Sequence, residues 1–201
     1  DVIKKAISLG LSGLETLSGI PGTIGGAVFG NAGAYGHSMM EVVEKVEILD
    51  LRRSKQRTKN KEQRIFRRKW LTNKQCGFRY RHSALKEKPY LALRVVLKLN
   101  PPTGGGDRAE LLKKSQEIIL AREKKYKPGI MCPGSFFKNV LVKDVSKKSL
   151  ALVDKSKIID GKIPAGWLLE QVGAKGMREG GIYIADFHGN LFVNDGKGMA
   201  R

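Results

Sequence analysis

Residues 19–36 read GIPGTIGGAVFGNAGAYG and place seven glycines in 18 positions. Glycine adopts backbone conformations that other residues rarely reach, and it lets main-chain amides approach a ligand closely. Consecutive amides of this kind can form a nest for an anionic group such as a pyrophosphate. The stretch is not the GxGxxG dinucleotide fingerprint, and it is not a P-loop because no GK[ST] follows it. Composition alone leaves a phosphate-binding loop and a tight structural loop equally open.

Apolar spacing on both sides of this stretch predicts a mixture of helices and strands. The expected helices cover 1–11, 107–126 and 164–172. The expected strands cover 42–49, 90–99, 136–142, 182–185 and 191–193. Asp107 is expected to cap the second helix, while Pro164 and Gly173 are expected to bound the third. The Pro- and Gly-containing linker 101–106 predicts a boundary between two domains.

The chain is strongly basic, with 38 Lys and Arg against 19 Asp and Glu and a net charge of +19. Such a balance suggests an anionic partner, which could be a nucleic acid, a phosphate-bearing small molecule or an acidic lipid surface. Residues 52–69 contain ten Lys or Arg and one acid. This run predicts a solvated hairpin or loop outside any active site. Aromatic residues are not interleaved with its charges, which argues against a nucleic-acid partner.

Cysteine and histidine are sparse, with two Cys and three His. Cys76 and Cys132 lie far apart and no CxxC occurs, so neither a disulfide framework nor a metal site is predicted. The apolar runs are shorter than the roughly 20 residues of a membrane-spanning helix, and the first residues lack signal-peptide features. A reducing cytoplasm without a membrane partner is the expectation.

Two further motifs carry residues that could take part in chemistry. In CGFRYRHS (76–83), Arg81 could bind a carboxylate through two hydrogen bonds or stabilise developing negative charge. In PGSFFKN (133–139), Ser135 could donate a proton, act as a nucleophile or cap a turn. The motif is not the GxSxG nucleophile elbow. A proton-donating serine needs a cationic or hydrogen-bonded neighbourhood, which Lys138 and Arg81 could supply.

A third motif, AGWLLEQ (165–171), contains Gln171, which could bind the polar edge of a ligand. Beyond it, His188 is interpreted as a turn histidine with satisfied hydrogen bonds and not as a base. In each motif the residues taken alone favour the structural interpretation, a surface strand or turn, over a catalytic one.

Taken together and in order, these strings resemble the UDP-N-acetylenolpyruvoylglucosamine reductase (MurB) family. The matching strings are GIPGTIGGA, NAGAYG, CGFRYRHS, PGSFFKN, AGWLLEQVGAKG and HGNLFVN. The resemblance implies an α+β fold, with a partial FAD-binding domain of the PCMH (vanillyl-alcohol-oxidase) type over 1–100 and a MurB-type substrate-binding domain over 101–201. It also implies a cytoplasmic enzyme of peptidoglycan precursor synthesis and cell wall biogenesis, which reduces UDP-N-acetylglucosamine enolpyruvate to UDP-N-acetylmuramate with FAD and NADPH.

The resemblance assigns roles to individual residues. Ser135 would protonate the substrate enolate, and Arg81 would bind near the enolpyruvyl carboxylate. The residues implied to contact FAD are Gly19, Ile20, Pro21, Gly22, Thr23, Gly25, Gly26, Ala27, Asn31, Gly33, Ala34, Tyr35 and Gly36. The residues implied to surround the UDP-sugar are Tyr80, Lys138, Asn139 and Gln171.

Two family features are missing from this sequence. The family's earlier Gly-rich FAD-binding segment is expected upstream of Asp1, and its catalytic glutamate is expected beyond Arg201. Two alternative functions stay open. One is a basic nucleic-acid-binding module, and the other is a different FAD oxidoreductase of the same fold.

Overall fold

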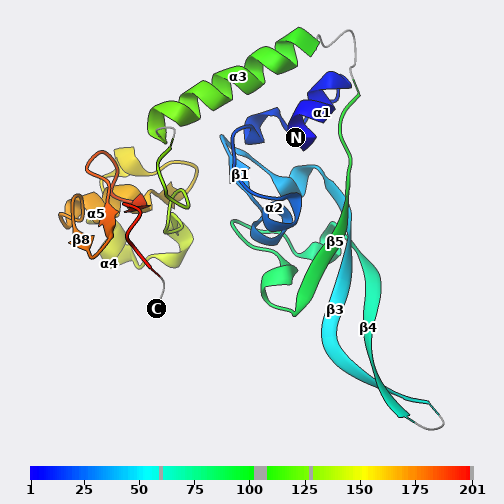
Figure 1. Ribbon diagram of the computed structural model, residues 1–201. Helices are drawn as coiled ribbons and strands as arrows, with labels where there is room; N and C mark the ends of the chain where they lie inside the picture. The colour runs from blue at the N-terminus through cyan, green and yellow to red at the C-terminus, as the bar shows by residue number, and fades with distance from the viewer. Residues whose placement is uncertain (59–60, 102–107, 127–128, 200–201) are drawn as a thin grey trace. The chain divides into compact units, whose positions relative to one another are not determined.

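The structure is a computed structural model that describes residues 1–58, 61–101, 108–126 and 129–199, with the backbone alone for 53–58 and 61–65 (Figure 1). Helices and short antiparallel sheets alternate along the chain, which gives an α+β protein. The chain divides into two compact units, Asp1–Arg122 and Glu123–Arg201. The predicted cap Asp107 and most of the predicted linker 101–106 lie outside the described residues, so both stay predictions.

The secondary structure is dominated by short elements. The α-helices are α1 (Val2–Ser8), α2 (Ile24–Gly30), α3 (Arg108–Lys125), α4 (Lys147–Leu150) and α5 (Ala165–Gln171). The 3-10 helices are η1 (Glu15–Leu17), η2 (Met39–Glu41), η3 (Lys74–Cys76), η4 (Ala84–Lys86), η5 (Val142–Asp144) and η6 (Lys155–Lys157). The strands are β1 (Gly33–Ala34), β2 (His37–Ser38), β3 (Val43–Thr58), β4 (Lys61–Thr72), β5 (Tyr90–Leu97), β6 (Val140–Leu141), β7 (Lys162–Ile163), β8 (Arg178–Glu179), β9 (Ile182–Ile184) and β10 (Phe192–Asn194).

The first unit is organised by an antiparallel sheet of order β4-β3-β5. Val46 on the central strand is paired with Leu71 on β4 and with Val95 on β5. Side chains alternate between the two faces of a sheet, so Val46 and Ile48 share one face, and both are fully buried. Helix α2 packs against β5. This inner face therefore forms the core of the unit.

Strands β3 and β4 continue beyond β5 as a two-stranded ribbon (Figure 1). The pairing of β3 with β5 ends at Asp50 and Tyr90, whereas its pairing with β4 continues to Thr58 and Lys61. The ribbon contains the described residues of the basic run 52–69, and its backbone pairing confirms the hairpin interpretation. Pairing with β4 also explains why β3 extends well past the strand expected at 42–49.

The second unit contains small sheets, β10-β9-β8 and β6-β7, with little regular structure between them. Its buried apolar cluster consists of Ala185, Leu191 and Val193, against which Tyr126 and Tyr183 pack. Helix α5 begins after Pro164 and is followed by Gly173, which has a φ of 70°, as the sequence predicted. The strands predicted near 182–185 and 191–193 are also present.

The strand predicted over 136–142 is wrong for most of its length, because only Val140–Leu141 forms a strand. Phe136 and Phe137 both contact Phe192, with ring centroids 4.5 and 5.8 Å away. Consecutive residues of a regular strand point to opposite faces, so they do not both contact one ring in this way. The Phe137 amide and carbonyl are instead both bonded to the Asn190 side chain, so they do not pair with a neighbouring strand.

Candidate functional site

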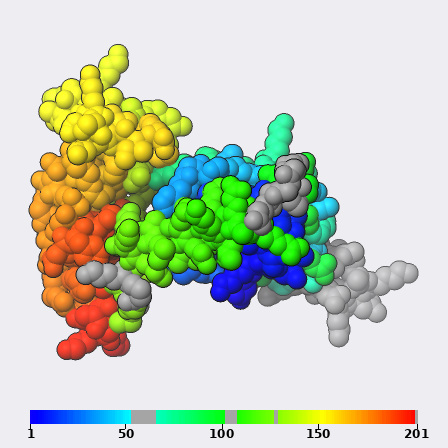
Figure 2. Space-filling view, turned by 90° about the horizontal axis from the view of Figure 1, so that it is seen from above, coloured from blue at the N-terminus to red at the C-terminus, as the bar shows by residue number. Residues whose placement is uncertain are grey.

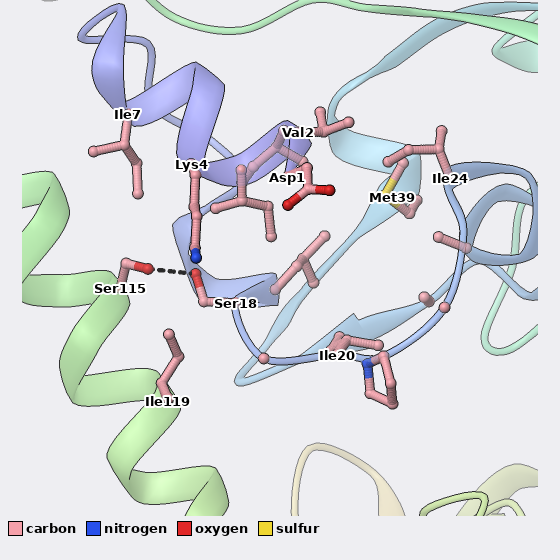
Figure 3. Close-up of a pocket in the computed structure, with 18 of the residues that line it drawn as sticks. Asp1, Val2, Lys4, Ile7, Ser18, Ile20, Ile24, Met39, Ser115 and Ile119 are labelled. Carbon is pink, nitrogen blue, oxygen red and sulfur yellow. Dashed lines mark hydrogen bonds between the residues drawn. The ribbon is translucent and has the colours of Figure 1, made fainter.

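A cavity of about 1230 Å³ lies in the first unit, among α1, the glycine-rich loop and α3 (Figure 3). In the view from above, the green surface of α3 borders the blue surface of the N-terminal residues (Figure 2). Isoleucine, leucine and valine side chains make up much of the lining, with a few hydroxyl and charged groups among them. The predicted FAD contacts that line the cavity are Gly19, Ile20, Pro21, Gly22, Thr23, Gly26 and Ala27.

The loop reaches this position because two of its glycines have positive φ angles, 72° at Gly19 and 123° at Gly22. A side chain at Gly19 would meet Arg122 of α3 at 3.2 Å, while nothing lies within 4 Å of one at Gly22. Gly19 and Gly22 are thus both needed for their backbone conformation, and a side chain at Gly19 would also displace the Arg122 side chain slightly. Thr23 then starts α2 as its N-cap, accepting a 3.1 Å hydrogen bond from the Gly26 amide.

Two polar contacts hold α3 against the cavity. The hydroxyls of Ser18 and Ser115 are 2.7 Å apart, the contact drawn dashed in Figure 3, and both serines are buried. Lys114 donates a 2.9 Å hydrogen bond to the buried carboxylate of Glu15, which also accepts one from the Gly13 amide. Burial acts to raise the pKa of Glu15, but hydrogen bonds from backbone amides and Lys114 outweigh it and lower this pKa.

The end of the glycine-rich stretch, NAGAYG (31–36), contacts the arginine motif CGFRYRHS (76–83), although the two lie far apart in sequence. Residues 33–38 form a tight hairpin whose turn residues Tyr35 and Gly36 both have positive φ angles. Arg81 donates a 2.5 Å hydrogen bond to the Gly33 carbonyl, and its guanidinium stacks on the Tyr80 ring at 5.4 Å. A side chain at Gly33 would come within 2.5 Å of the His37 carbonyl, so only glycine fits there.

Asn31 is a buried brace between these segments. Its side-chain amide donates to the Arg79 carbonyl at 3.0 Å and accepts from the Met40 amide at 2.9 Å. Nearby, the buried Ser83 hydroxyl donates to the Phe29 carbonyl at 2.8 Å. These contacts tie the arginine motif to the end of α2. The predicted FAD contacts that do not line the cavity are Gly25, Asn31, Gly33, Ala34, Tyr35 and Gly36.

In the second unit, the Ser135 side chain is exposed at the end of a turn whose preceding residue, Gly134, has a φ of 86°. Its hydroxyl lies 3.4 Å from the Tyr126 hydroxyl. Ser135 also forms an isolated bridge with Leu191, which is fully buried. The Ser135 hydroxyl is therefore open to a ligand, while the Ser135 backbone is fixed by its bridge to the buried Leu191.

Asn190 is the residue that fixes this turn, and the sequence interpretation gave it no role. It is fully buried, its Nδ2 donates to the Phe137 carbonyl at 2.9 Å, and its Oδ1 accepts from the Phe137 amide at 2.8 Å. Its own carbonyl accepts from the Phe136 amide. The sequence did contain a signal for this role, because Asn190 follows a glycine and directly precedes the predicted strand 191–193. Asparagine in such a position often forms hydrogen bonds from its side chain to the backbone.

The remaining predicted residues of this unit have varied surroundings. Lys138 and Gln171 are exposed, whereas the Asn139 side chain accepts a 3.2 Å hydrogen bond from the Ala165 amide at the start of α5. Burial lowers the pKa of His188, whose Nδ1 accepts from the Asn190 amide at 3.0 Å. A neutral ring held in this way agrees with the turn interpretation of His188.

The two predicted catalytic residues, Arg81 and Ser135, belong to different units, and their mutual proximity stays a prediction. The first unit holds a guanidinium on the Gly33 carbonyl and the Tyr80 ring, and the second holds an exposed hydroxyl on a turn that is bonded to Asn190. Among the side chains that the structure describes, no group of three or more His, Cys, Asp or Glu could hold a metal ion. No helix in the described part of the chain is long and apolar enough to span a membrane.

Curated relatives and a solved structure align along the whole chain, and a family model matches its C-terminal part. The family model described as UDP-N-acetylenolpyruvoylglucosamine reductase, C-terminal domain, matches residues 127–201. Proteins named UDP-N-acetylenolpyruvoylglucosamine reductase are 43% identical in Solibacter usitatus and 36% identical in Bacillus pumilus, and both align over all of this chain. The solved reductase (MurB) from Thermus caldophilus superimposes with a TM-score of 0.67 at 31% identity, again over all of this chain. The chain spans 59%, 55% and 59% of these three proteins.

Proposed function

We propose that this chain, which belongs to the UDP-N-acetylenolpyruvoylglucosamine reductase family, is part of an FAD enzyme that reduces UDP-N-acetylglucosamine enolpyruvate to UDP-N-acetylmuramate with NADPH. This reaction would supply a peptidoglycan precursor in the cytoplasm. The observation that carries the proposal is the glycine-rich loop at the edge of a large apolar cavity, within a chain that matches reductases along its whole length.

The residues around the cavity fit a flavin dinucleotide. Its volume of about 1230 Å³ exceeds the roughly 300–1,000 Å³ of common small-ligand sites. Apolar side chains such as Ile20 and Ile24 would contact a ring system, while the loop backbone from Gly19 to Thr23 would approach the phosphates. When bound, the flavin would supply hydride to the enolpyruvyl double bond. The part of the FAD-binding domain formed here would be of the PCMH type.

Arg81 would bind the substrate carboxylate and stabilise the enolate. Its guanidinium is already fixed by the Gly33 carbonyl and the Tyr80 ring. A guanidinium has five N–H donors, and it pairs with a carboxylate through two of them. Tyr80, Lys138, Asn139 and Gln171 would surround the UDP-sugar.

Ser135 would donate the proton that completes the reduction, to the carbon next to the carboxylate. The hydroxyl is exposed, and the Tyr126 hydroxyl, 3.4 Å away, would be the neighbouring group that returns the proton to it. The rigid turn held by Asn190 would keep the donor at a fixed position. General acid catalysis of this kind contributes about 10²–10⁴-fold.

Stopped-flow measurement of the two half-reactions in the full-length enzyme tests this proposal. Ser135→Ala should leave flavin reduction by NADPH near normal and slow flavin reoxidation by substrate by about 10²–10⁴-fold. Ser135→Cys should recover part of the rate because a thiol also donates. The matched control is Ser146→Ala, which removes a serine that caps α4 and should cost only about 1 kcal/mol of stability. Reoxidation of Ser135→Ala at the wild-type rate would remove the proton-donor role.

Absorbance and substrate dependence separate the proposal from its two alternatives. A purified full-length protein with flavin absorbance, and NADPH oxidation that requires the enolpyruvyl sugar, would support the reductase. Flavin absorbance with activity only on other substrates would favour a different oxidoreductase of the same fold. A colourless protein with salt-sensitive binding to random DNA would favour a nucleic-acid-binding module.

A further inference from the structure

Helix α5 packs closely against the turn at residues 188–190. Gly166 and Glu170 lie four residues apart in this helix and therefore share one of its faces. A Cβ at Gly189 would come within 2.9 Å of the Gly166 carbonyl and within 2.8 Å of the Glu170 Cγ. Glycine at this point of the turn is thus what allows the helix face to approach the turn so closely.

Glu170 joins α5 to this turn through a hydrogen bond. Its Oε1 accepts from the Gly189 amide at 3.1 Å, and its Oε2 lies 3.2 Å from the Lys175 Nζ. The hydrogen bond from Gly189 lowers the pKa of Glu170 against the effect of burial, and Lys175 adds to the lowering. The carboxylate is therefore ionised at neutral pH, and its bond to the turn is charge-assisted.

The same turn also holds the residues that follow Ser135. The Asn190 side chain bonds both the amide and the carbonyl of Phe137, and the Asn190 carbonyl accepts from the residue between Ser135 and Phe137 at 3.0 Å. Gly189 and Asn190 are adjacent in the chain. Glu170 therefore fixes the residue next to the one that holds the Ser135 turn.

We propose that Glu170 is a positioning residue for the proton donor Ser135. It would act through the turn at 188–190, by keeping Asn190 in the place where it bonds the Phe137 backbone. The inference rests on the role proposed above for Ser135. Displacement of a reacting group by about 1 Å can cost about 10²-fold in rate. A turn loosened by loss of the Glu170 bond would therefore slow the protonation step in a protein that still folds.

The contacts of Glu170 disfavour other roles. An acid in the reaction needs a pKa near the operating pH, whereas the pKa of Glu170 is lowered. A carboxylate that bound the proposed UDP-sugar would repel its negative phosphates. The ion pair with Lys175 is partly exposed, and pairs of this kind contribute little to stability. The hydrogen bond to Gly189 is thus the contact that has a consequence for the site.

Stopped-flow measurement of flavin reoxidation by substrate in the full-length enzyme tests this role. Glu170→Ala removes the acceptor and should slow reoxidation by about tenfold or more, with flavin reduction by NADPH near normal. Glu170→Gln keeps an oxygen that accepts from Gly189 and should retain most of the rate. Glu170→Asp keeps the charge but withdraws the carboxylate by one methylene, so it should be slow, and it tests the bond even if the alanine variant does not fold. A glutamine variant as slow as the aspartate variant would overturn the proposal.

The matched control is Asp195→Ala, in the same unit. Asp195 lies 2.6 Å from the Arg178 guanidinium and accepts a 3.0 Å hydrogen bond from the Lys197 amide. It thus has the same two kinds of contact as Glu170, a cation and a backbone amide, but it does not bond to the turn at 188–190. Its removal should leave reoxidation at the wild-type rate. Equal losses in Asp195→Ala and Glu170→Ala would show general destabilisation and overturn the proposal.

A double variant separates positioning from any other effect on the reaction. If Glu170 acts through the Ser135 hydroxyl, adding Glu170→Ala to Ser135→Ala should slow reoxidation no further, because the group that it positions is gone. A further loss equal to that of Glu170→Ala alone would show that Glu170 acts elsewhere, and the proposal would be wrong.

Hydrogen exchange gives a measurement that needs neither flavin nor substrate. The Phe137 amide, which Asn190 holds, should exchange faster in Glu170→Ala than in the wild type or in Glu170→Gln. Unchanged exchange would overturn the positioning role even where Ser135 is the proton donor. Faster exchange together with normal reoxidation in Ser135→Ala would place the failure in the proton-donor role and not in the link from Glu170 to the turn.

Discussion

The two units of this protein position their functional groups by different physical means. In the described residues of the first unit, 13 buried apolar residues form one continuous core around a three-stranded sheet. The corresponding cluster of the second unit consists of three residues, Ala185, Leu191 and Val193. There the turn that carries Ser135 is held by hydrogen bonds from the side chain of Asn190.

This difference shows which kind of residue supports each site. In the first unit, the glycine-rich loop is fixed because the core and α3 fix its flanks, so apolar packing indirectly shapes the cavity. In the second unit, the apolar cluster is small, and the side-chain amide of Asn190 holds the turn beside it. Apolar substitutions should therefore affect the first unit most, and one polar substitution should affect the second.

The largest expected effect is from Ile48→Ala, which removes a fully buried side chain at the centre of the sheet. Truncations of this type cost about 2–5 kcal/mol because they lose buried area and leave a cavity. Hydrogen exchange resolved by mass spectrometry should show faster exchange in Asp1–Arg122 and little change in the second unit. Leu91→Ala, on the exposed face of the same sheet, should stay within about 0.5 kcal/mol. Equal effects in both units would contradict the comparison.

Asn190→Ala should cost about 2 kcal/mol, because it leaves the partly buried amide and carbonyl of Phe137 without their partner. Asn190→Asp is the sharper variant. It keeps the size of the side chain and the acceptor for the Phe137 amide, but it cannot donate to the Phe137 carbonyl when ionised. Exchange of the backbone amides near Ser135 should accelerate in both variants, with no change in the first unit. Normal protection in Asn190→Ala would show that the aromatic rings alone hold the turn.

Glu15 gives the first unit a dependence on acid. Its pKa is lowered in the folded protein, so its stabilising contribution is complete above the ordinary value of 4.5 and is lost as pH falls through the lower folded value. Glu15→Gln should cost about 1–2 kcal/mol at neutral pH and should flatten the stability curve below pH 4.5. Thermal unfolding of both proteins between neutral and acidic pH measures this. If the unfolding temperatures of the two proteins changed in parallel with pH, the pKa of Glu15 would not differ between the folded and unfolded states.

The smallest expected effect is from Thr23→Ala, which removes the N-cap of α2 at the cavity. Loss of a cap costs about 1 kcal/mol. Thr23→Ser keeps the oxygen that accepts from Gly26 and should restore the wild-type unfolding temperature. Failure of serine to restore it would assign the effect to the lost methyl group and not to the cap.

Much of the regular structure could be predicted from the sequence. Apolar spacing located α1, and the Pro164 and Gly173 signals located α5, since these features act within one element. The contacts that build the site could not be predicted in the same way. The approach of Arg81 to Gly33 and the role of Asn190 depend on segments about 50 residues apart, and only the fold brings such segments together. Local patterns also failed at Phe136 and Phe137, where both rings pack on Phe192.

The contact between Asn190 and Phe137 has a consequence for the order of folding. It joins residues 53 positions apart, whereas β3 and β4 are neighbours in a hairpin. Closing a long loop costs more chain entropy than closing a short one, and that cost is met only when the contact at its end forms. Strands β3 and β4 can therefore pair early in folding, while the turn under Ser135 waits until the chain from 137 to 190 has collapsed. The proposed proton donor would be among the last groups to take its place.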